Sequence, residues 1–221
     1  MIKIHDLHVA VHQKTILENI SCDLPTNSWI CIVGPNGAGK TTLIAQLAGE
    51  IAPDEGSIAF EGRDITALDP PSRAALGIGR SFQITSVFGP LTVAENAALA
   101  VQAHRGHAFR FWRRAARDAA LMDAALALLK QVGLKSRAAL LAADLSHGEQ
   151  RQLEIAMALA GKPRLLLLDE PMAGMGSADS RRMVEFLARL KGQTAMLLVE
   201  HDMDAVFALA DRITVLTYGR V

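Results

Sequence analysis

The segment that most constrains the fold is a nine-residue loop that matches G-x-x-x-x-G-K-[ST], namely Gly34-Pro35-Asn36-Gly37-Ala38-Gly39-Lys40-Thr41-Thr42. The apolar run before it, residues 29–33, predicts a buried strand, and residues 43–48 after it predict a helix. Between a strand and a helix, such a loop turns backbone N–H groups and the positive end of the helix dipole toward a polyphosphate. The sequence therefore predicts a phosphate site in an α/β protein.

Two side chains of this loop suit a nucleotide. Lys40 would place a positive charge on the β- and γ-phosphates, and the Thr41 hydroxyl would ligate Mg²⁺. The alternative is a glycine-rich turn that matches the pattern by chance, and the flanking strand and helix argue against it. The loop alone does not say which nucleotide is bound.

The composition sets wider bounds. The chain has 221 residues, enough for one large domain or a domain with a subdomain. Lys plus Arg equals Asp plus Glu at 23 each, so no bulk charge argues for nucleic acid or an anionic membrane. No apolar run approaches the length of a membrane span, and the first residues lack a signal-peptide core. Cys22 and Cys31 show no metal or redox spacing and are expected to be reduced core cysteines of a cytosolic protein.

The pattern changes character along the chain. Residues 1–83 alternate short apolar runs with turns, which predicts an antiparallel sheet beside the phosphate loop, a short helix at 70–76 and a strand at 77–83. Residues 91–160 are rich in Ala and Leu with helical spacing, and no strand pattern lies between Gln83 and Leu165. Apolar strands and helices then alternate, with strands at 165–168, 195–199 and 212–216, which predicts a parallel, doubly wound sheet with right-handed crossovers.

Polar residues stand where several predicted strands end. Asp169 follows an apolar strand and can hold Mg²⁺ through water, and Glu170 can orient or deprotonate an attacking water. His201 follows the strand at 195–199 and could reach the γ-phosphate region, or could be an ordinary loop histidine facing solvent. Gln83 ends a strand and alone would mean little.

Taken together, these residues resemble the ATP-binding subunit of an ABC transporter over nearly the whole chain. Gly34–Thr42 resembles the Walker A motif, and Gln83 resembles the Q-loop glutamine. Residues 145–150 (Leu-Ser-His-Gly-Glu-Gln) resemble the family signature. Asp169-Glu170 resembles the end of the Walker B motif with the catalytic glutamate, and His201 resembles the H-loop histidine. The resemblance implies an α/β fold: a P-loop NTPase core with a mostly parallel sheet, an N-terminal antiparallel β subdomain (together residues 1–83 and 162–221), and an inserted α-helical subdomain (84–161).

The resemblance also implies a composite site for ATP and Mg²⁺. The implied catalytic residues are Glu170, His201, Lys40 and Gln83, and the implied metal ligands are Thr41, Gln83 and Asp169. The implied nucleotide contacts are Gly34, Pro35, Asn36, Gly37, Ala38, Gly39, Lys40, Thr41, Thr42, Val11, Ser146 and Gly148. In this family two subunits pair head to tail, so Ser146 and Gly148 of one would cap the nucleotide held by the other. ATP would close the dimer, and hydrolysis would reopen it.

Four positions depart from the family pattern. His147 replaces the first signature glycine, Glu149 stands where glutamine is usual, and Gly176 stands where the D-loop usually has Asp. The family often stacks an aromatic residue on adenine at the position of Val11, so adenine here meets a weaker apolar contact, or His12 stacks instead. The family also usually continues with a strand and a helical tail beyond Val221, where this sequence stops.

Local motifs resemble the ATPases of branched-chain amino acid importers, a group that also includes importers of urea, short amides and aromatic acids. They are residues 79–83, 91–96, 153–156, 173–175 and 198–203. The implied partners are a second ATPase (the same chain or a paralogue), transmembrane permease subunits and, indirectly, a periplasmic solute-binding protein, at the cytoplasmic face of the inner membrane. The transported solute is not encoded in any site of this chain.

The alternative function is a soluble ABC ATPase that acts on nucleic acid or the ribosome. The chain has neither a long coiled-coil insertion nor a second ATPase half, and Glu170 and His201 argue against a non-enzymatic binding module. Residues 104–117 form the one basic and aromatic cluster. A solvated loop, or a surface near the permease and lipid headgroups, is favoured there over nucleic acid, which is not expected as a partner.

Overall fold

The computed structural model describes residues 1–11, 14–81, 86–104 and 118–221. The chain divides into two compact units. The first contains residues 1–80, 164–171 and 187–221, and the second contains residues 81–163 and 172–186. Residues 172–186, which the family resemblance implies to be part of the core, thus group with the second unit.

The first unit contains an antiparallel sheet with the strand order β2-β1-β4-β5. Its strands are β1 (Ile2–Val11), β2 (Lys14–Leu24), β4 (Glu55–Phe60) and β5 (Arg63–Asp64). The buried face of β1 carries Ile2 and Ile4 and then, after Asp6 with its positive φ of 47°, Leu7 and Val9. The register to β2 shifts between Ile4 and Leu7, so this bulge moves the apolar alternation by one residue and keeps the same face buried.

The first unit also contains a five-stranded sheet with the order β6-β7-β8-β3-β9, in which all neighbours are parallel. Its strands are β3 (Trp29–Val33), β6 (Ile78–Arg80), β7 (Leu165–Asp169), β8 (Ala195–Val199) and β9 (Arg212–Val215). Every residue of β7 and β8 is buried, as expected for central strands of a parallel sheet. The predicted α/β fold class, with a parallel and an antiparallel sheet, is confirmed.

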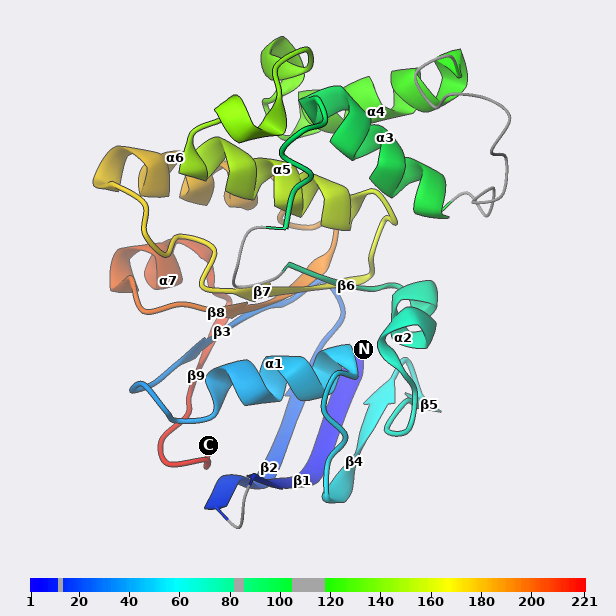
Figure 1. The fold of residues 1–221 in the computed structure, drawn as a ribbon. Helices are drawn as coiled ribbons and strands as arrows, with labels where there is room; N and C mark the ends of the chain where they lie inside the picture. Colours follow the sequence, from blue (N-terminus) through cyan, green and yellow to red (C-terminus); the bar gives the residue numbers. More distant parts are fainter. Residues whose placement is uncertain (12–13, 82–85, 105–117) are drawn as a thin grey trace. The chain divides into compact units, whose positions relative to one another are not determined.

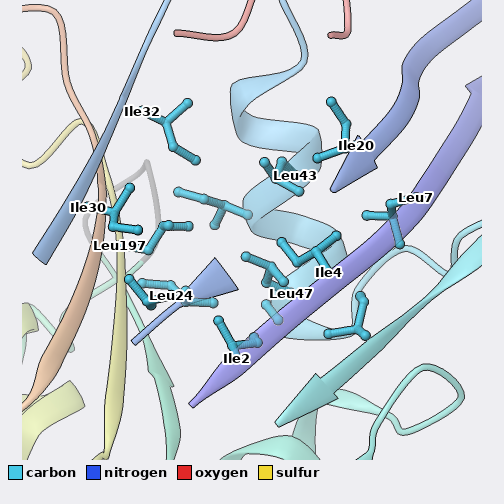
Figure 2. Packing of buried hydrophobic residues seen from close by; sticks show 14 of the residues in the cluster. Ile2, Ile4, Leu7, Ile20, Leu24, Ile30, Ile32, Leu43, Leu47 and Leu197 are labelled. Atoms are coloured by element: carbon cyan, nitrogen blue, oxygen red, sulfur yellow. The ribbon is translucent and has the colours of Figure 1, made fainter. Parts of the chain in front are cut away.

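Helix α1 (Lys40–Ala48) lies between the two sheets of this unit, while α2 (Pro70–Leu76) and α7 (Met203–Leu209) complete it (Figure 1). One hydrophobic core joins α1 to strands of both sheets. Figure 2 shows Leu43 and Leu47 of α1 between Ile4 and Ile20 of the antiparallel sheet and Ile32 of the parallel sheet. The helix that follows the phosphate loop is therefore held on two sides by apolar packing.

Arg73 of α2 holds the far end of α1. This side chain is buried, and its guanidinium donates hydrogen bonds to the carbonyls of Gln46 and Leu47 at 2.6 and 3.0 Å. It also donates to the carbonyls of Thr66 and Leu68. The last carbonyls of a helix lack partners within the helix, so Arg73 satisfies two of them with a positive charge at the negative end of the helix dipole.

Gln46 is the polar residue of α1 that the core does not satisfy. Its side chain is fully buried, and neither its amide oxygen nor its amide nitrogen has a hydrogen-bond partner among the described residues. A buried amide without partners costs roughly 1–3 kcal/mol. We expect Gln46→Met, which has a similar length, to raise the free energy of unfolding by about 1 kcal/mol in a denaturant titration. Unchanged or lower stability would contradict this expectation, and nucleotide affinity should stay the same.

The described residues of the second unit form helices joined by turns and loops, with no strand among them. The unit contains α3 (Val93–His104), α4 (Ala119–Gln131), α5 (His147–Leu159), most of α6 (Ser177–Ala188), and the short 3₁₀ turns η2 (Lys135–Arg137) and η3 (Ala142–Asp144). Thr92 and Glu95 form a capping box at the start of α3, since the Glu95 N–H donates to Thr92 Oγ1 and the Thr92 N–H donates to the Glu95 carboxyl. Asp118 caps α4 through the Leu121 N–H.

Of the strand predicted at 77–83, Ile78–Arg80 form β6, while Gly77 and Ser81 are not part of it and residues 82–85 lie outside the described part of the chain. Helix α6 ends at Ala188. None of the described helices combines the length and the apolar character that crossing a bilayer requires.

Candidate nucleotide-binding site

The phosphate loop connects β3 to α1, and two of its glycines are required by neighbouring residues. A Cβ on Gly34 would lie 2.0 Å from the carbonyl oxygen of Leu216. A Cβ on Gly39, where φ is 101°, would lie 2.6 Å from the Leu17 side chain. Gly37 also has a positive φ, of 79°, but a Cβ there would meet no described atom within 4 Å. The fold thus fixes the two ends of the loop and leaves its middle facing open space.

The start of α1 is suited to an anion. Gly39 occupies the N-cap position, and no described side chain accepts a hydrogen bond there from the first helical N–H groups. Lys40 is buried, and its ammonium donates to the carbonyls of Gly34 and Pro35 at 2.8 and 3.1 Å. Thr41 is exposed at the same helix start. A polyphosphate here would meet backbone donors and a lysine already folded over the loop.

A hairpin turn after β9 supports the phosphate loop, a role that no sequence pattern indicates. The Gly219 N–H donates to the Ala38 carbonyl at 3.1 Å, and the Gly219 carbonyl accepts from the Glu18 N–H at 2.8 Å. The Arg220 guanidinium donates to both carboxyl oxygens of Glu18, at 2.7 and 3.2 Å. Residues 219 and 220 are therefore bonded to the loop and to β2.

Two acidic residues lie where β7 ends. Asp169 is the last residue of the strand, is fully buried and pairs with Val199 of β8. Glu170 follows with φ of 47°, a left-handed conformation that is uncommon outside glycine, and its N–H donates to the Val199 carbonyl at 2.9 Å. A strained non-glycine residue at the carboxyl end of a buried strand is typical of a functional site.

His201 lies beside Glu170. The Nδ1 atom of His201 is 3.5 Å from Glu170 Oε1, and the two side chains are 54% and 17% exposed. The structure thus brings together two of the residues predicted to be catalytic, from the ends of the adjacent strands β7 and β8. A carboxyl group paired with a partly exposed imidazole can accept or relay a proton.

The signature segment lies in the second unit. Ser146 is the N-cap of α5, and its hydroxyl accepts from the Glu149 N–H, while the Ser146 N–H donates to the Glu149 carboxyl at 3.0 Å. The Arg137 Nε donates to Glu149 at 3.0 Å. Burial acts to raise the pKa of Glu149, but the hydrogen bonds from Ser146 and Arg137 outweigh it and leave the pKa lowered. Glutamate at this position therefore completes a capping box.

Several of the predicted site residues lie outside the described part of the chain or in the second unit. Gln83, His12 and residues 105–117 lie outside the described part of the chain, as does the side chain of Val11. His147 is exposed and Gly148 is buried beside Asp179, all within the second unit. A Cβ on Gly176 would meet no described atom within 4 Å, so that position would accept a larger residue.

A glycine loop between a parallel strand and a helix, with acidic residues at the end of a second strand, defines a P-loop nucleotide-binding ATPase. Residues 17–173 match the family model described as ABC transporter. The chain belongs to the ABC transporter family and is an ATPase.

Curated relatives agree with this assignment. The chain is 35% identical to the high-affinity branched-chain amino acid transport ATP-binding protein LivG of Salmonella typhimurium, over 92% of this chain and 82% of that protein. It is 35% identical to the high-affinity branched-chain amino acid transport ATP-binding protein BraF of Pseudomonas aeruginosa, over 86% of this chain and 77% of that protein. It is also 34% identical to the Fe(3+) ions import ATP-binding protein FbpC of Streptomyces avermitilis, over 94% and 57%.

Solved structures share the fold. A nucleotide-free ATP-binding cassette from an ABC transporter superposes with a TM-score of 0.87 at 25% identity, over 100% of this chain and 88% of that chain. The ADP conformation of MJ1267, an ATP-binding cassette of an ABC transporter, superposes with a TM-score of 0.87 at 26% identity, again over 100% of this chain and 88% of that chain.

Proposed function

We propose that this chain is the ATP-hydrolysing subunit of an ABC importer that takes up branched-chain amino acids or a related small polar solute. The observation that carries the catalytic part is the Glu170–His201 pair next to Asp169, at the same sheet edge as the phosphate loop. The solute class rests on the similarity to LivG and BraF, since FbpC is named for iron import instead.

The proposed chemistry assigns one task to each residue. The backbone N–H groups of Gly37 to Lys40 and the Lys40 ammonium hold the β- and γ-phosphates. Glu170 Oε1 accepts a proton from the water that attacks the γ-phosphorus in line, and His201 donates a hydrogen bond on the same side. Gln83 would complete the water and metal contacts.

The residues proposed for Mg²⁺ fit that ion by their chemistry. Thr41 offers an exposed hydroxyl at the helix start, and Asp169 offers carboxyl oxygens at the end of β7. Hard oxygen ligands and few protein carboxylates are what Mg²⁺ prefers beside a nucleotide. When bound, the ion would neutralise charge that develops on the transferred phosphoryl group.

The proposed active unit is a head-to-tail dimer. Ser146 is exposed at the start of α5, and its hydroxyl accepts one backbone bond and keeps its own proton to donate. In the dimer, Ser146 and Gly148 would face the γ-phosphate held by the other subunit. A second ATPase, permease subunits and a periplasmic solute-binding protein are the proposed partners, with the chain on the cytoplasmic face of the membrane.

Affinity purification from membranes of the source cells tests this function. Co-purification of a polytopic membrane protein, together with uptake of leucine or a related solute that is lost on deletion of the ATPase, is the expected result. Recovery of ribosomes or DNA without a membrane protein would refute transport and favour the alternative of a soluble ABC ATPase. Uptake of an inorganic ion alone would refute the solute class and leave the importer assignment standing.

A further inference from the structure

Glu200 lies between the strand that ends at Val199 and the proposed catalytic His201. It is a charged residue type in a buried position, with an exposed fraction of only 2%. Its N–H is directed at the Ile32 carbonyl of the neighbouring strand β3 at 3.4 Å, so its backbone continues the parallel sheet. A carboxyl group at this depth is costly unless hydrogen bonds satisfy it, so its contacts indicate what it does.

The Glu200 carboxyl contacts the backbone of the two residues that follow. Its Oε2 atom accepts from the His201 N–H at 2.8 Å and lies 3.4 Å from the Asp202 nitrogen. Asp202 in turn caps helix α7, with its Oδ1 atom accepting from the N–H groups of Asp204 and Ala205 at 3.0 and 3.3 Å. His201 thus lies between the Glu200 carboxyl, which holds the backbone of His201, and the Asp202 carboxyl, which caps the start of α7.

This arrangement affects His201 more than its neighbours. The imidazole is 54% exposed, and its contact with Glu170 is 3.5 Å long. Packing therefore does little to orient it, and the direction of its Cα–Cβ bond follows from the backbone that Glu200 holds. A small rotation of this peptide would move Nδ1 beyond reach of Glu170.

We propose that Glu200 is a positioning residue for hydrolysis, which holds the backbone of His201 so that the imidazole faces Glu170 and the γ-phosphate. The proposal rests on the proposed role of His201. The groups that its Oε2 atom contacts at His201 and Asp202 are neutral peptide N–H groups, so this role requires an acceptor oxygen at position 200. Glutamine retains such an oxygen at the same length, whereas alanine does not.

The test compares Glu200→Ala and Glu200→Gln, each alone and combined with His201→Ala, in steady-state ATP hydrolysis. We expect Glu200→Ala to lower kcat about tenfold with the KM for ATP unchanged, and Glu200→Gln to stay within about threefold of wild type. In the His201→Ala background, Glu200→Ala should lower kcat no further, since it acts through the missing side chain.

Two controls separate positioning from folding. Asp69 caps α2 through the Ser72 N–H, so Asp69→Ala removes another carboxyl-to-backbone bond, an exposed one, elsewhere in the same unit. It should lower the unfolding temperature without lowering kcat. An equal loss of kcat in Asp69→Ala and Glu200→Ala, or a full further loss from Glu200→Ala in the His201→Ala background, would overturn the proposal. Full hydrolysis by His201→Ala alone would instead overturn the role of His201 given under Proposed function, and this inference with it.

Discussion

Replacing Glu170 with glutamine should nearly abolish ATP hydrolysis and leave ATP binding intact. An amide cannot accept the proton of the attacking water, and loss of a general base lowers rates by roughly 10²–10⁴-fold. Glutamine has the shape of glutamate, and the backbone bond from Glu170 to the Val199 carbonyl does not involve the side chain. We therefore expect kcat to fall at least about 100-fold while the Kd for ATP stays within about threefold.

The same variant reports on the proposed dimer. If ATP closes two subunits and hydrolysis reopens them, Glu170→Gln should accumulate as a dimer on size-exclusion chromatography with ATP and Mg²⁺, and run as a monomer with ADP. Glu55→Gln on β4, an exposed glutamate of the same unit, is the matched control and should behave as wild type. Phosphate release by Glu170→Gln at half the wild-type rate would remove Glu170 from its proposed role.

Local patterns were enough to predict the elements that hold the site. The apolar runs at 29–33 and 165–168 each follow a polar residue, and they form strands β3 and β7, in which four and five residues are buried. The helical spacing of residues 91–160 likewise predicted helices, and the structure adds the capping box of Ser146 and Glu149 at the start of α5. In these cases the signal lies within a few residues, where chain geometry and burial act directly.

Contacts between distant segments could not be predicted in this way. Gly219 bonds to Ala38, and Arg220 pairs with Glu18, across most of the sequence, and no local pattern marks those residues as partners. In the sequence, Glu200 resembles an ordinary polar residue at a strand exit, and only its burial beneath the His201 peptide shows otherwise. The alternation in β1 likewise does not indicate the left-handed Asp6 that shifts its register.

Adding one methyl group to Gly39 should be far more damaging than adding it to Gly37, although both glycines have positive φ. At Gly39 the new Cβ would lie 2.6 Å from Leu17 Cδ2 and 2.9 Å from the Ile16 carbonyl oxygen. Overpacking of this kind costs typically about 1–3 kcal/mol, and a left-handed alanine adds about 1–2 kcal/mol. We expect Gly39→Ala to lower the free energy of unfolding by about 2–5 kcal/mol and to eliminate measurable ATP binding.

Gly37→Ala is the matched comparison because it changes the same group in the same loop. Only the left-handed backbone is strained there, so the loss of stability should be about 1–2 kcal/mol, and the protein should fold. Its Cβ enters the open space in the middle of the loop, where the proposed phosphates lie, so ATP affinity should fall even though the fold survives. Urea unfolding and equilibrium dialysis with ATP measure the two quantities separately. Equal stability of the two variants would mean that the close approach of Ile16 and Leu17 of β2 is not what requires glycine at position 39. Unchanged ATP affinity of Gly37→Ala would mean that the phosphates lie elsewhere on the loop.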